Sequence, residues 1–315
     1  MPAAGYGSWT LGESQRRDHV RSPELRLAPV LLLQFFVSGV VTGCFLILAT
    51  IGFSLTRRVE GFLNIAHAEL LGVSAFTTWW LNAELGVHVI VAAGVAIAFT
   101  AVVGLLIARV IYDPIRARGP AVLLITSTGV AFVLGGIIDG LIGTGIRTLQ
   151  IGLAERYEVF GIRITSHQLL MVLLAAATSV SLAVFLNRTR TGLAIRAMSA
   201  NPSLAASRGV NLSATSRATW LLSSSLAGIA GVMLAVVATL TTDLAFAQIL
   251  QILAVAILAG LGSLYAVILS GLLVGIAMDV SAFWIPAGYR PLVAFAVVIV
   301  VLVLRPAGLA GTRAA

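Results

Sequence analysis

The chain has 315 residues, of which 59% are hydrophobic and 10% are charged, and its mean hydropathy is +1.04. These values lie far outside the usual range of a soluble globular domain, so we expect a protein embedded in lipid. All 20 basic residues are arginine, and they outnumber the 12 acidic residues. Because they gather in a few loops of a membrane protein, they report orientation, and nucleic-acid binding is disfavoured.

Long apolar runs recur along the whole chain. A helix that crosses a hydrocarbon core of about 30 Å needs about 20 mostly apolar residues. Backbone groups in lipid must be paired internally, and the runs are too long for barrel strands, so the sequence predicts an all-α, polytopic transmembrane helical bundle. We expect about eight spans, plus broken or re-entrant segments, at residues 28–55, 87–111, 121–142, 167–186, 218–240, 246–259, 264–280 and 291–304.

The amino-terminal segment, residues 1–27, is polar and rich in arginine. A signal peptide has a shorter apolar core, followed by a small-residue cleavage pattern that is not found here, so we expect a flexible cytoplasmic tail before a retained helix. No Pro/Ser linker or charged block divides the apolar runs. We therefore expect a single transmembrane domain at 28–308 and a short tail at 309–315.

A ninth apolar run, Phe62 to Leu81, is interrupted by Asn64, His67 and Glu69. If this run spans the membrane, the arginines near the amino terminus lie outside the cell. If it dips into the membrane and returns, that terminus stays cytoplasmic, but Arg57 lies outside, against the tendency of arginine-rich loops to stay inside. Both arrangements stay open, and a broken or re-entrant element is the preferred one.

The three interrupting residues are candidates for a substrate path, because ionisable groups inside a membrane are costly and usually functional. A second interruption, at Gly260, Gly262 and Ser263, lies in the other half of the chain, and paired interruptions point to a solute path. The alternative is structural: the asparagine caps a helix, the histidine lies in its first turn, and the glutamate bonds a neighbouring segment. We expect no metal site, since one histidine with one carboxylate lacks the ligand count.

The loops at 109–118 and 188–217 are rich in arginine, so we expect them in the cytoplasm. The mixed-charge segment 144–166 then lies outside, and the later runs alternate so that Arg305 is again cytoplasmic. The two assignments agree with each other, which supports one orientation for the whole bundle.

Three aspartates, Asp139, Asp243 and Asp279, fall near the predicted outer ends of helices. A carboxylate is easily solvated there, so we expect interfacial water to solvate all three. Small residues recur within the apolar runs, and Gly271 and Gly275 have the four-residue spacing that lets helices approach closely. We expect these glycines to serve helix packing.

The loop at 188–217 is far longer than a helix connection needs to be. Asn201 can cap a helix that starts at Pro202, and Gly209 can end it in the left-handed conformation, which predicts about two turns of short helix. Such a helix is unstable alone in water. It therefore needs a surface to lie against: its own membrane domain, a partner protein or, as the alternative, the lipid surface.

The stretch RTRTGLAIRAMSANPSLAASRGVN in this loop resembles the cytoplasmic coupling segment of branched-chain amino-acid (Liv-type) ABC transporter permeases. GFLNIAHAELLGVSAF, ARVIYDPIRARGPAVLLITSTGVAF and LAVAILAGLGSLYAVILSGLLVGI resemble other motifs of that family, in the family's order. The resemblance implies a translocation subunit in the bacterial inner membrane that works with a second permease, two ATP-hydrolysing subunits and an extracytoplasmic solute-binding protein. The residues that it implies for ATPase coupling are Arg190, Gly192, Arg196, Asn201, Pro202, Ala205, Arg208 and Gly209.

We expect no enzyme activity and no cofactor in the chain itself. A phosphate-cradling Walker loop needs a lysine, and the chain has none, so ATP hydrolysis belongs to a separate polypeptide. An ion-coupled secondary transporter is the alternative, with Glu69 as the deep carboxylate it would need. The implied solutes are branched-chain or other amino acids, with urea, amides or sugars as alternatives, and the choice between a homodimer and a heterodimer stays open.

Overall fold

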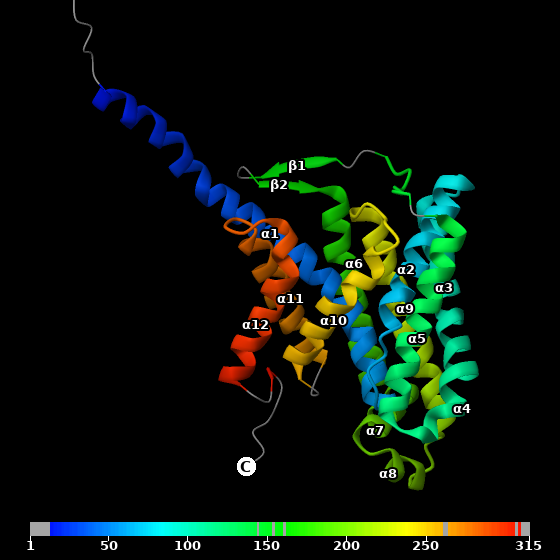
Figure 1. Ribbon diagram of the computed structural model, residues 1–315. Coiled ribbons are helices and arrows are strands. Elements are labelled where there is room, and N and C mark those ends of the chain that lie inside the picture. Colours follow the sequence, from blue (N-terminus) through cyan, green and yellow to red (C-terminus); the bar gives the residue numbers. More distant parts are fainter. Residues whose placement is uncertain are drawn as a thin grey trace, which may run out of the picture.

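The structure, a computed structural model, is an all-α bundle with one short hairpin at its end (Figure 1). Every apolar run expected to span is a helix, which confirms the predicted fold class. By length and composition, six of the described helices can cross a membrane, and two shorter apolar helices accompany them. The structure describes residues 13–143, 145–152, 155–159, 162–260, 264–305 and 308–309, with side chains from residue 30 onward except 159 and 287.

Long helices build the bundle, and short ones connect them. The bundle helices are α1 (Glu13–Glu60), α2 (His67–Trp79), α3 (Val89–Ile107), α5 (Pro120–Ile142), α6 (Ser166–Arg188), α9 (Leu212–Val237), α10 (Leu244–Ala259), α11 (Leu264–Ser281) and α12 (Arg290–Leu304). The connecting elements are η1 (Trp80–Glu84), η2 (Ala108–Tyr112), α4 (Asp113–Ile115), η3 (Arg116–Arg118), α7 (Arg190–Ala200), α8 (Pro202–Ser207) and η4 (Ala287–Tyr289).

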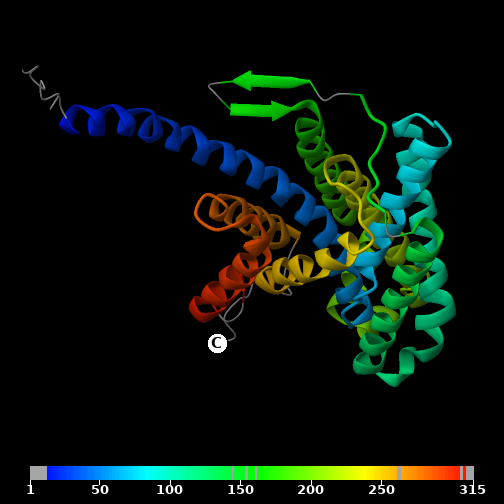
Figure 2. The same ribbon diagram turned by 45° about the horizontal axis from the view of Figure 1, so that its top comes forward.

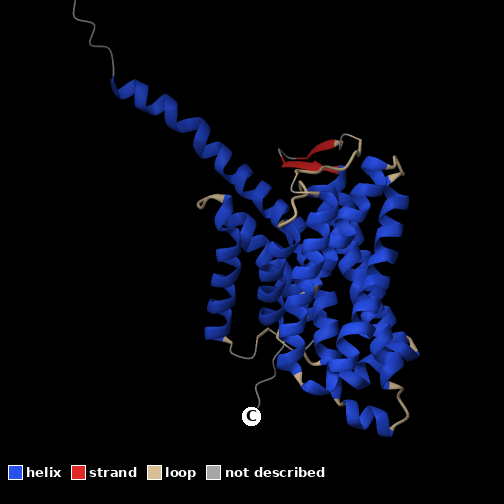
Figure 3. Ribbon diagram, turned by 45° about the vertical axis from the view of Figure 1, so that its right-hand side comes forward, coloured by secondary structure: helices blue, strands red, loops and turns tan. Residues whose placement is uncertain are grey.

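The two ends of the bundle differ in secondary structure, as Figure 3 shows, and they also differ in charge. At one end, which we call the outer end, β1 (Arg156–Val159) and β2 (Ile162–Thr165) form an antiparallel hairpin with Arg156 opposite Thr165. At the other, the inner end, α7 and α8 project from the bundle (Figure 1). Arginines gather at the inner end, which supports its cytoplasmic placement; those described there are Arg57, Arg58, Arg109, Arg116, Arg118, Arg188, Arg190, Arg196, Arg208, Arg217 and Arg305.

α2 crosses the bundle from the inner end to the outer end. Before its start, Asn64 Oδ1 accepts a hydrogen bond from the Tyr112 hydroxyl at the inner end (3.1 Å). Beyond its end, Asn82 Oδ1 accepts one from the backbone N–H of Gln150 in the outer connection (2.9 Å). The re-entrant arrangement preferred for this run is therefore wrong. Its polar residues are compatible with a crossing because nearly all of α2 is buried against protein, where lipid does not select for apolar side chains.

α1 runs in the opposite direction, from the outer end to the inner end. Gln34 exchanges two hydrogen bonds with the backbone of Arg163 in the hairpin, at 3.0 and 2.8 Å. The last residue of the helix, Glu60, forms an ion pair with Arg116 at the inner end. The helix thus starts at Glu13 on the outer side, not on the cytoplasmic side as expected (Figure 1). As a result, Arg57 and Arg58 in the last turn of α1 lie at the inner end.

α9 lies at the centre of the bundle, packed against α1, α2 and α3. Buried hydroxyls join it to its neighbours: Ser74 Oγ of α2 donates to the carbonyl of Gly228 (2.7 Å), and Ser223 Oγ donates to the carbonyl of Gly52 in α1 (2.7 Å). α3, α5 and α6 lie at the periphery and expose large apolar side chains such as Leu141, which suits contact with lipid.

The most extensive helix contact among the described residues lies between α1 and α11. Gly39 and Gly43 of α1 face Gly271 and Gly275 of α11, so each helix presents two glycines four residues apart. A Cβ atom built on Gly271 would lie 2.6 Å from Ile47 Cγ1, and one built on Gly275 would overlap the backbone of α1. The predicted packing role of the α11 glycines is confirmed. In Figure 2, α11 and α12, in orange and red, lie beside α1, away from the cyan and green helices at the far end of the bundle.

Candidate functional site

The short helix α8 forms at the inner end as the sequence predicts. Asn201 precedes it in an extended conformation, and its Oδ1 accepts a hydrogen bond from the backbone N–H of Leu204 (3.0 Å). Pro202 occupies the first helical position, where no backbone donor is needed. Gly209 follows with φ of +84°, a conformation that glycine adopts without strain. The local motif therefore defines both ends of α8.

α7 joins α8 to the bundle. Its cap is Thr189, whose Oγ1 accepts a hydrogen bond from the backbone N–H of Gly192 (3.0 Å). At that glycine the helix passes so close to the end of α6 that a Cβ atom would overlap the backbone of Leu186. On the next turn, Ile195 and Met198 pack into a buried cluster with Leu55 and Val59 of α1. Movement of α7 must therefore displace the inner end of α1.

The outward face of α7 and α8 is basic and partly apolar. Leu193 and Leu204 expose 63% and 56% of their surface, whereas Ala205 is buried against its neighbours. Arginines surround these leucines, and the connection from 188 to 217 contains no acidic residue. The implied coupling residues Arg190, Arg196 and Arg208 are all exposed. This face can bind a partner that offers an apolar groove with acidic residues around it.

A polar junction lies beside this element, and sequence reasoning did not find it. The side chain of Glu60, the last residue of α1, is 5% exposed, and its carboxylate accepts a hydrogen bond from Ser216 of α9 (2.6 Å). The other carboxylate oxygen lies 2.6 Å from Arg116 Nη2 of η3. Tyr112 and Trp220 stack next to it, with ring centroids 5.2 Å apart. The junction ties together the inner ends of α1, η3 and α9.

Replacing Glu60 with alanine is expected to lower the stability of the protein by about 2 kcal/mol, because the change removes two charge-assisted contacts at a site with little access to water. Thermal unfolding of the detergent-solubilised protein measures this. The control is Arg118→Ala, which removes an exposed arginine from η3, the element that also carries Arg116. Equal midpoints for the two variants would show that the junction contributes no stability.

The three polar residues of the α2 region do not form one site. Asn64 lies in the unwound segment before α2 and bonds Tyr112, so it does not cap the helix by its side chain. His67 is the first residue of α2, and its Nε2 lies 3.0 Å from the carbonyl oxygen of Ala49. Glu69 is buried beside Gly135, and within the described residues its Oε2 has no hydrogen-bond partner. The first two therefore have structural contacts, and the third faces the α2–α5 interface.

Gly260 lies in a turn between two helices, not within a broken one. It ends α10 with φ of +70°, and α11 begins at Leu264. Nearby, the backbone N–H of Leu309 donates to the carbonyl of Leu258 (3.0 Å), which holds the described part of the carboxyl end against α10. Gly262 and Ser263 lie outside the described residues. A path role for these positions stays a prediction.

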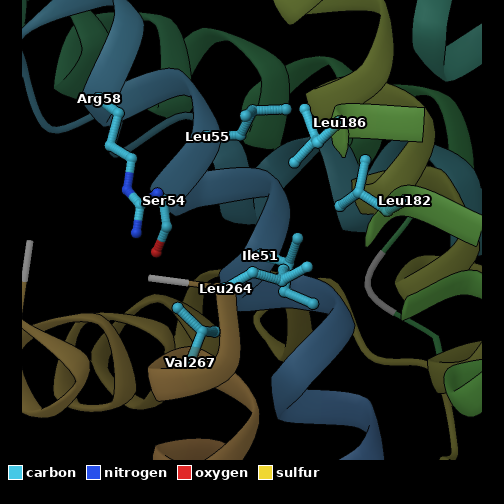
Figure 4. A pocket seen from close by; sticks show the side chains of 8 residues that line it. All are labelled: Ile51, Ser54, Leu55, Arg58, Leu182, Leu186, Leu264 and Val267. Atoms are coloured by element: carbon cyan, nitrogen blue, oxygen red, sulfur yellow. The ribbon is translucent and has the colours of Figure 1, made fainter. Parts of the chain in front are cut away.

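Two cavities lie along α1, α6 and α11. The inner cavity has a volume of about 30 Å³, and Figure 4 shows Ser54 and Arg58 of α1 on one side of it. The outer cavity has a volume of about 410 Å³, and its lining includes Thr42, Asp279 and Arg290. Of the path residues that the structure describes, none lines either cavity.

The expectation that water solvates all three outer aspartates is correct for two of them and wrong for the third. Asp139 and Asp243 are exposed, in agreement with solvation by water at a helix end. Asp279 is buried instead, and Thr42 of α1 donates a hydrogen bond to it. The reason is tertiary: α1 and the start of α12 cover the end of α11. A signal was present in the sequence, since Asp279 and Arg290 flank the same short outer turn with opposite charge.

Comparison with known proteins identifies relatives over almost the whole chain. Residues 35–302 match the family model described as branched-chain amino acid transport system / permease component. The chain is 27% identical over 293 residues to the high-affinity branched-chain amino acid transport system permease protein LivH of Escherichia coli (strain K12), covering 89% of this chain and 95% of the relative. Identity and coverage are the same for the permease protein BraD of Pseudomonas aeruginosa. PsaBC from Streptococcus pneumoniae, in complex with Fab, superposes with a TM-score of 0.42 at 15% identity, covering 91% of this chain and 94% of that chain.

Proposed function

The chain belongs to the family of branched-chain amino acid transport system permease components, and from this premise we propose that it is a translocation subunit of an ATP-driven importer for branched-chain amino acids in the bacterial inner membrane. In this proposal it assembles with a second permease subunit, with ATP-hydrolysing subunits on the cytoplasmic side, and with an extracytoplasmic solute-binding protein. ATP hydrolysis resides in the partner, since the chain lacks the lysine of a phosphate-binding loop.

The exposed helix α8 is the observation that carries this proposal. It has six residues, and most of its surface is open to solvent, so its own packing contributes little to holding it folded. Its apolar Leu204 is exposed next to Arg208. An exposed leucine on a capped helix at the cytoplasmic end is suited to insertion into a groove of a partner. A partner bound to α8 on the cytoplasmic side would have access to ATP.

A mechanical connection supports coupling between such a partner and the solute path. α7 packs on α1 at Val59, and the same helix lines the outer cavity at Phe45. At a rise of about 1.5 Å per residue, these two positions are about 20 Å apart along one continuous helix. Closure of the partner would therefore shift the helix that lines both cavities, which is what alternating access requires.

The ion-coupled alternative receives less support. It needs a carboxylate that an ion can reach from the solute path. Glu69, the deep candidate, lies beside Gly135 at the α2–α5 interface and lines neither cavity. Uptake that requires the partner ATPase and persists when the proton gradient is collapsed would separate the two mechanisms.

Replacing Leu204 with aspartate tests the proposal. A buried leucine contributes about 1.5–3 kcal/mol, so losing it should weaken ATPase binding roughly tenfold to a hundredfold. We expect the amount of ATPase that co-purifies with tagged permease, and uptake of labelled leucine, to fall together. Ser213→Asp is the control, because it adds the same charge at an exposed position in the first turn of α9, where an acid is tolerated. Normal recovery of ATPase with the Leu204 variant would contradict the docking role.

A further inference from the structure

The outer cavity is large enough to hold a small molecule. Its volume of about 410 Å³ lies within the range of roughly 300–1,000 Å³ that is typical of small-molecule sites. Side chains from α1, α6, α9, α10, α11 and α12 line it, so six helices meet there.

One part of the cavity wall carries two opposite charges. The Asp279 side chain is 3% exposed, and its Oδ2 accepts a hydrogen bond from Thr42 Oγ1 (2.8 Å). Its other oxygen, Oδ1, lies 3.3 Å from Arg290 Nη1, close enough for an ion pair. The geometry is not that of a hydrogen bond, and within the described residues both Asp279 Oδ1 and Arg290 Nε lack a hydrogen-bond partner. A buried acceptor and donor are thus left for something else to use.

The rest of the lining is mainly apolar and adaptable. Three methionines, Met171, Met233 and Met278, come from three different helices, and Val41 and Phe45 of α1 lie among them. Thioether side chains are flexible and polarizable, so they adjust to apolar groups of different branching. This part of the wall accepts an aliphatic side chain, while Gln248 and Gln251 of α10 line another part of the cavity.

We propose that the outer cavity binds the free amino acid as a zwitterion, with its carboxylate at Arg290, its ammonium group at Asp279 and its aliphatic side chain among the methionines. This assignment rests on the proposed function and adds to it a place where the permease itself recognises the solute. A neutral sugar, urea or an amide would offer an opposite charge to neither Asp279 nor Arg290, so it would not replace their mutual ion pair. A simple carboxylate would meet Arg290 but also the negative charge of Asp279.

The cavity is also placed for onward movement. Three of the helices that line the outer cavity also line the inner one. They contribute Ile51 of α1, Leu182 of α6 and Val267 of α11 to the inner cavity. On α6 the step from Met171 to Leu182, and on α11 the step from Val267 to Met278, is about three helical turns, so both cavities face the same sides of these helices. A solute released from the charged pair would thus move along the α1–α6–α11 contact.

Protection of an introduced cysteine tests this site directly. Cys44 is the single cysteine, so Cys44→Ala with Val237→Cys leaves one thiol at a position that lines the cavity and is 53% exposed. The permease–ATPase complex in liposomes, without binding protein, is labelled from outside with a membrane-impermeant thiol reagent. L-Leucine should slow labelling, and at ten times the half-protecting concentration the rate should fall about tenfold. 4-Methylpentanoate and 3-methylbutylamine, which each lack one charge, should not protect at that concentration.

Charge variants identify the two recognition groups. Asp279→Asn and Arg290→Gln, each in this background, should raise the half-protecting leucine concentration about tenfold or more, because each removes one charge-assisted contact. Arg290→Lys keeps the charge and should retain part of the protection. Asp243→Asn is the matched control, since that acid is exposed at the same end and does not line the cavity. Unchanged labelling without leucine shows that each variant keeps its fold.

The outcomes separate this inference from the proposed function. Leucine uptake by the complete transporter without any leucine protection would overturn the cavity assignment and leave the proposed function standing. Equal protection by 4-methylpentanoate or 3-methylbutylamine would overturn recognition of the zwitterion. Absence of ATP-dependent uptake of every branched-chain amino acid would contradict the proposed function itself. Protection that requires both charges supports both proposals.

Discussion

Replacing Gly275 with leucine is expected to prevent the permease from folding into a stable bundle. A Cβ atom at this position would overlap the backbone nitrogen and Cα of Gly43, and backbone atoms cannot move aside as a flexible side chain can. The two helices would have to separate along their closest contact, at a cost of about 3 kcal/mol or more. We expect little monodisperse protein on size-exclusion chromatography in detergent and rapid proteolysis in membranes.

Gly136→Leu is the matched control for this prediction. Gly136 also lies in the middle of a helix, α5, but nothing surrounds the position that a Cβ atom would occupy. Leucine there would project toward lipid, where it is well accepted. A Gly275 variant that purifies as well as the Gly136 variant would mean that α1 and α11 do not pack as described, and both cavities would then need a different account.

Replacing residues 199–208 with an equally long glycine–serine segment is expected to reduce solute uptake to that of cells without the permease. The change removes α8 and its cap at Asn201 while leaving the packing of Ile195 and its cluster on α1 intact. Without α8, the proposed ATPase partner has no rigid element to move, because a flexible segment transmits little force. Uptake of labelled leucine in cells is the measurement.

Membrane insertion should survive this replacement, since the segment lies outside the spanning helices. Immunoblots of the membrane fraction, and labelling of Arg305→Cys from the cytoplasmic side in a Cys44→Ala background, check that amount and orientation are unchanged. An equal-length replacement in the outer hairpin at 155–164 is the comparison, because it alters a loop of similar size on the opposite side. Uptake that continues after loss of α8 would remove the basis of the coupling proposal.

Local signals in the sequence were sufficient for several features. The cap, proline and terminating glycine of α8 lie within nine residues of each other, so short-range chemistry defines the helix without reference to the rest of the fold. The apolar runs predicted their helices for a similar reason, since lipid imposes the same requirement on every exposed span. The Liv-type resemblance was also readable, and the family match over residues 35–302 confirms it.

Features that depend on which residues become neighbours in the folded protein were not predicted. The polar residues in the run at 62–81 led to the prediction that it does not cross the membrane. However, α2 is enclosed by protein, so its polarity does not indicate whether it crosses. Asp279 was expected in water, but Thr42 and Arg290 cover it from segments 237 and 11 residues away in the chain. Gly275 contacts α1. The four-residue spacing of the glycines predicts that another helix packs closely there, but it does not identify that helix.

The sequence by itself therefore determined that this protein is a helical membrane permease of its family, how its inner end is charged, and where the short helix α8 begins and ends. All of these depend on composition or on residues close together in the chain. Only the tertiary structure decided the direction of α1 and α2, the glycine contact between α1 and α11, and the meeting of Asp279 with Arg290 at the outer cavity. Those depend on contacts between distant segments, for which local propensity carries no information.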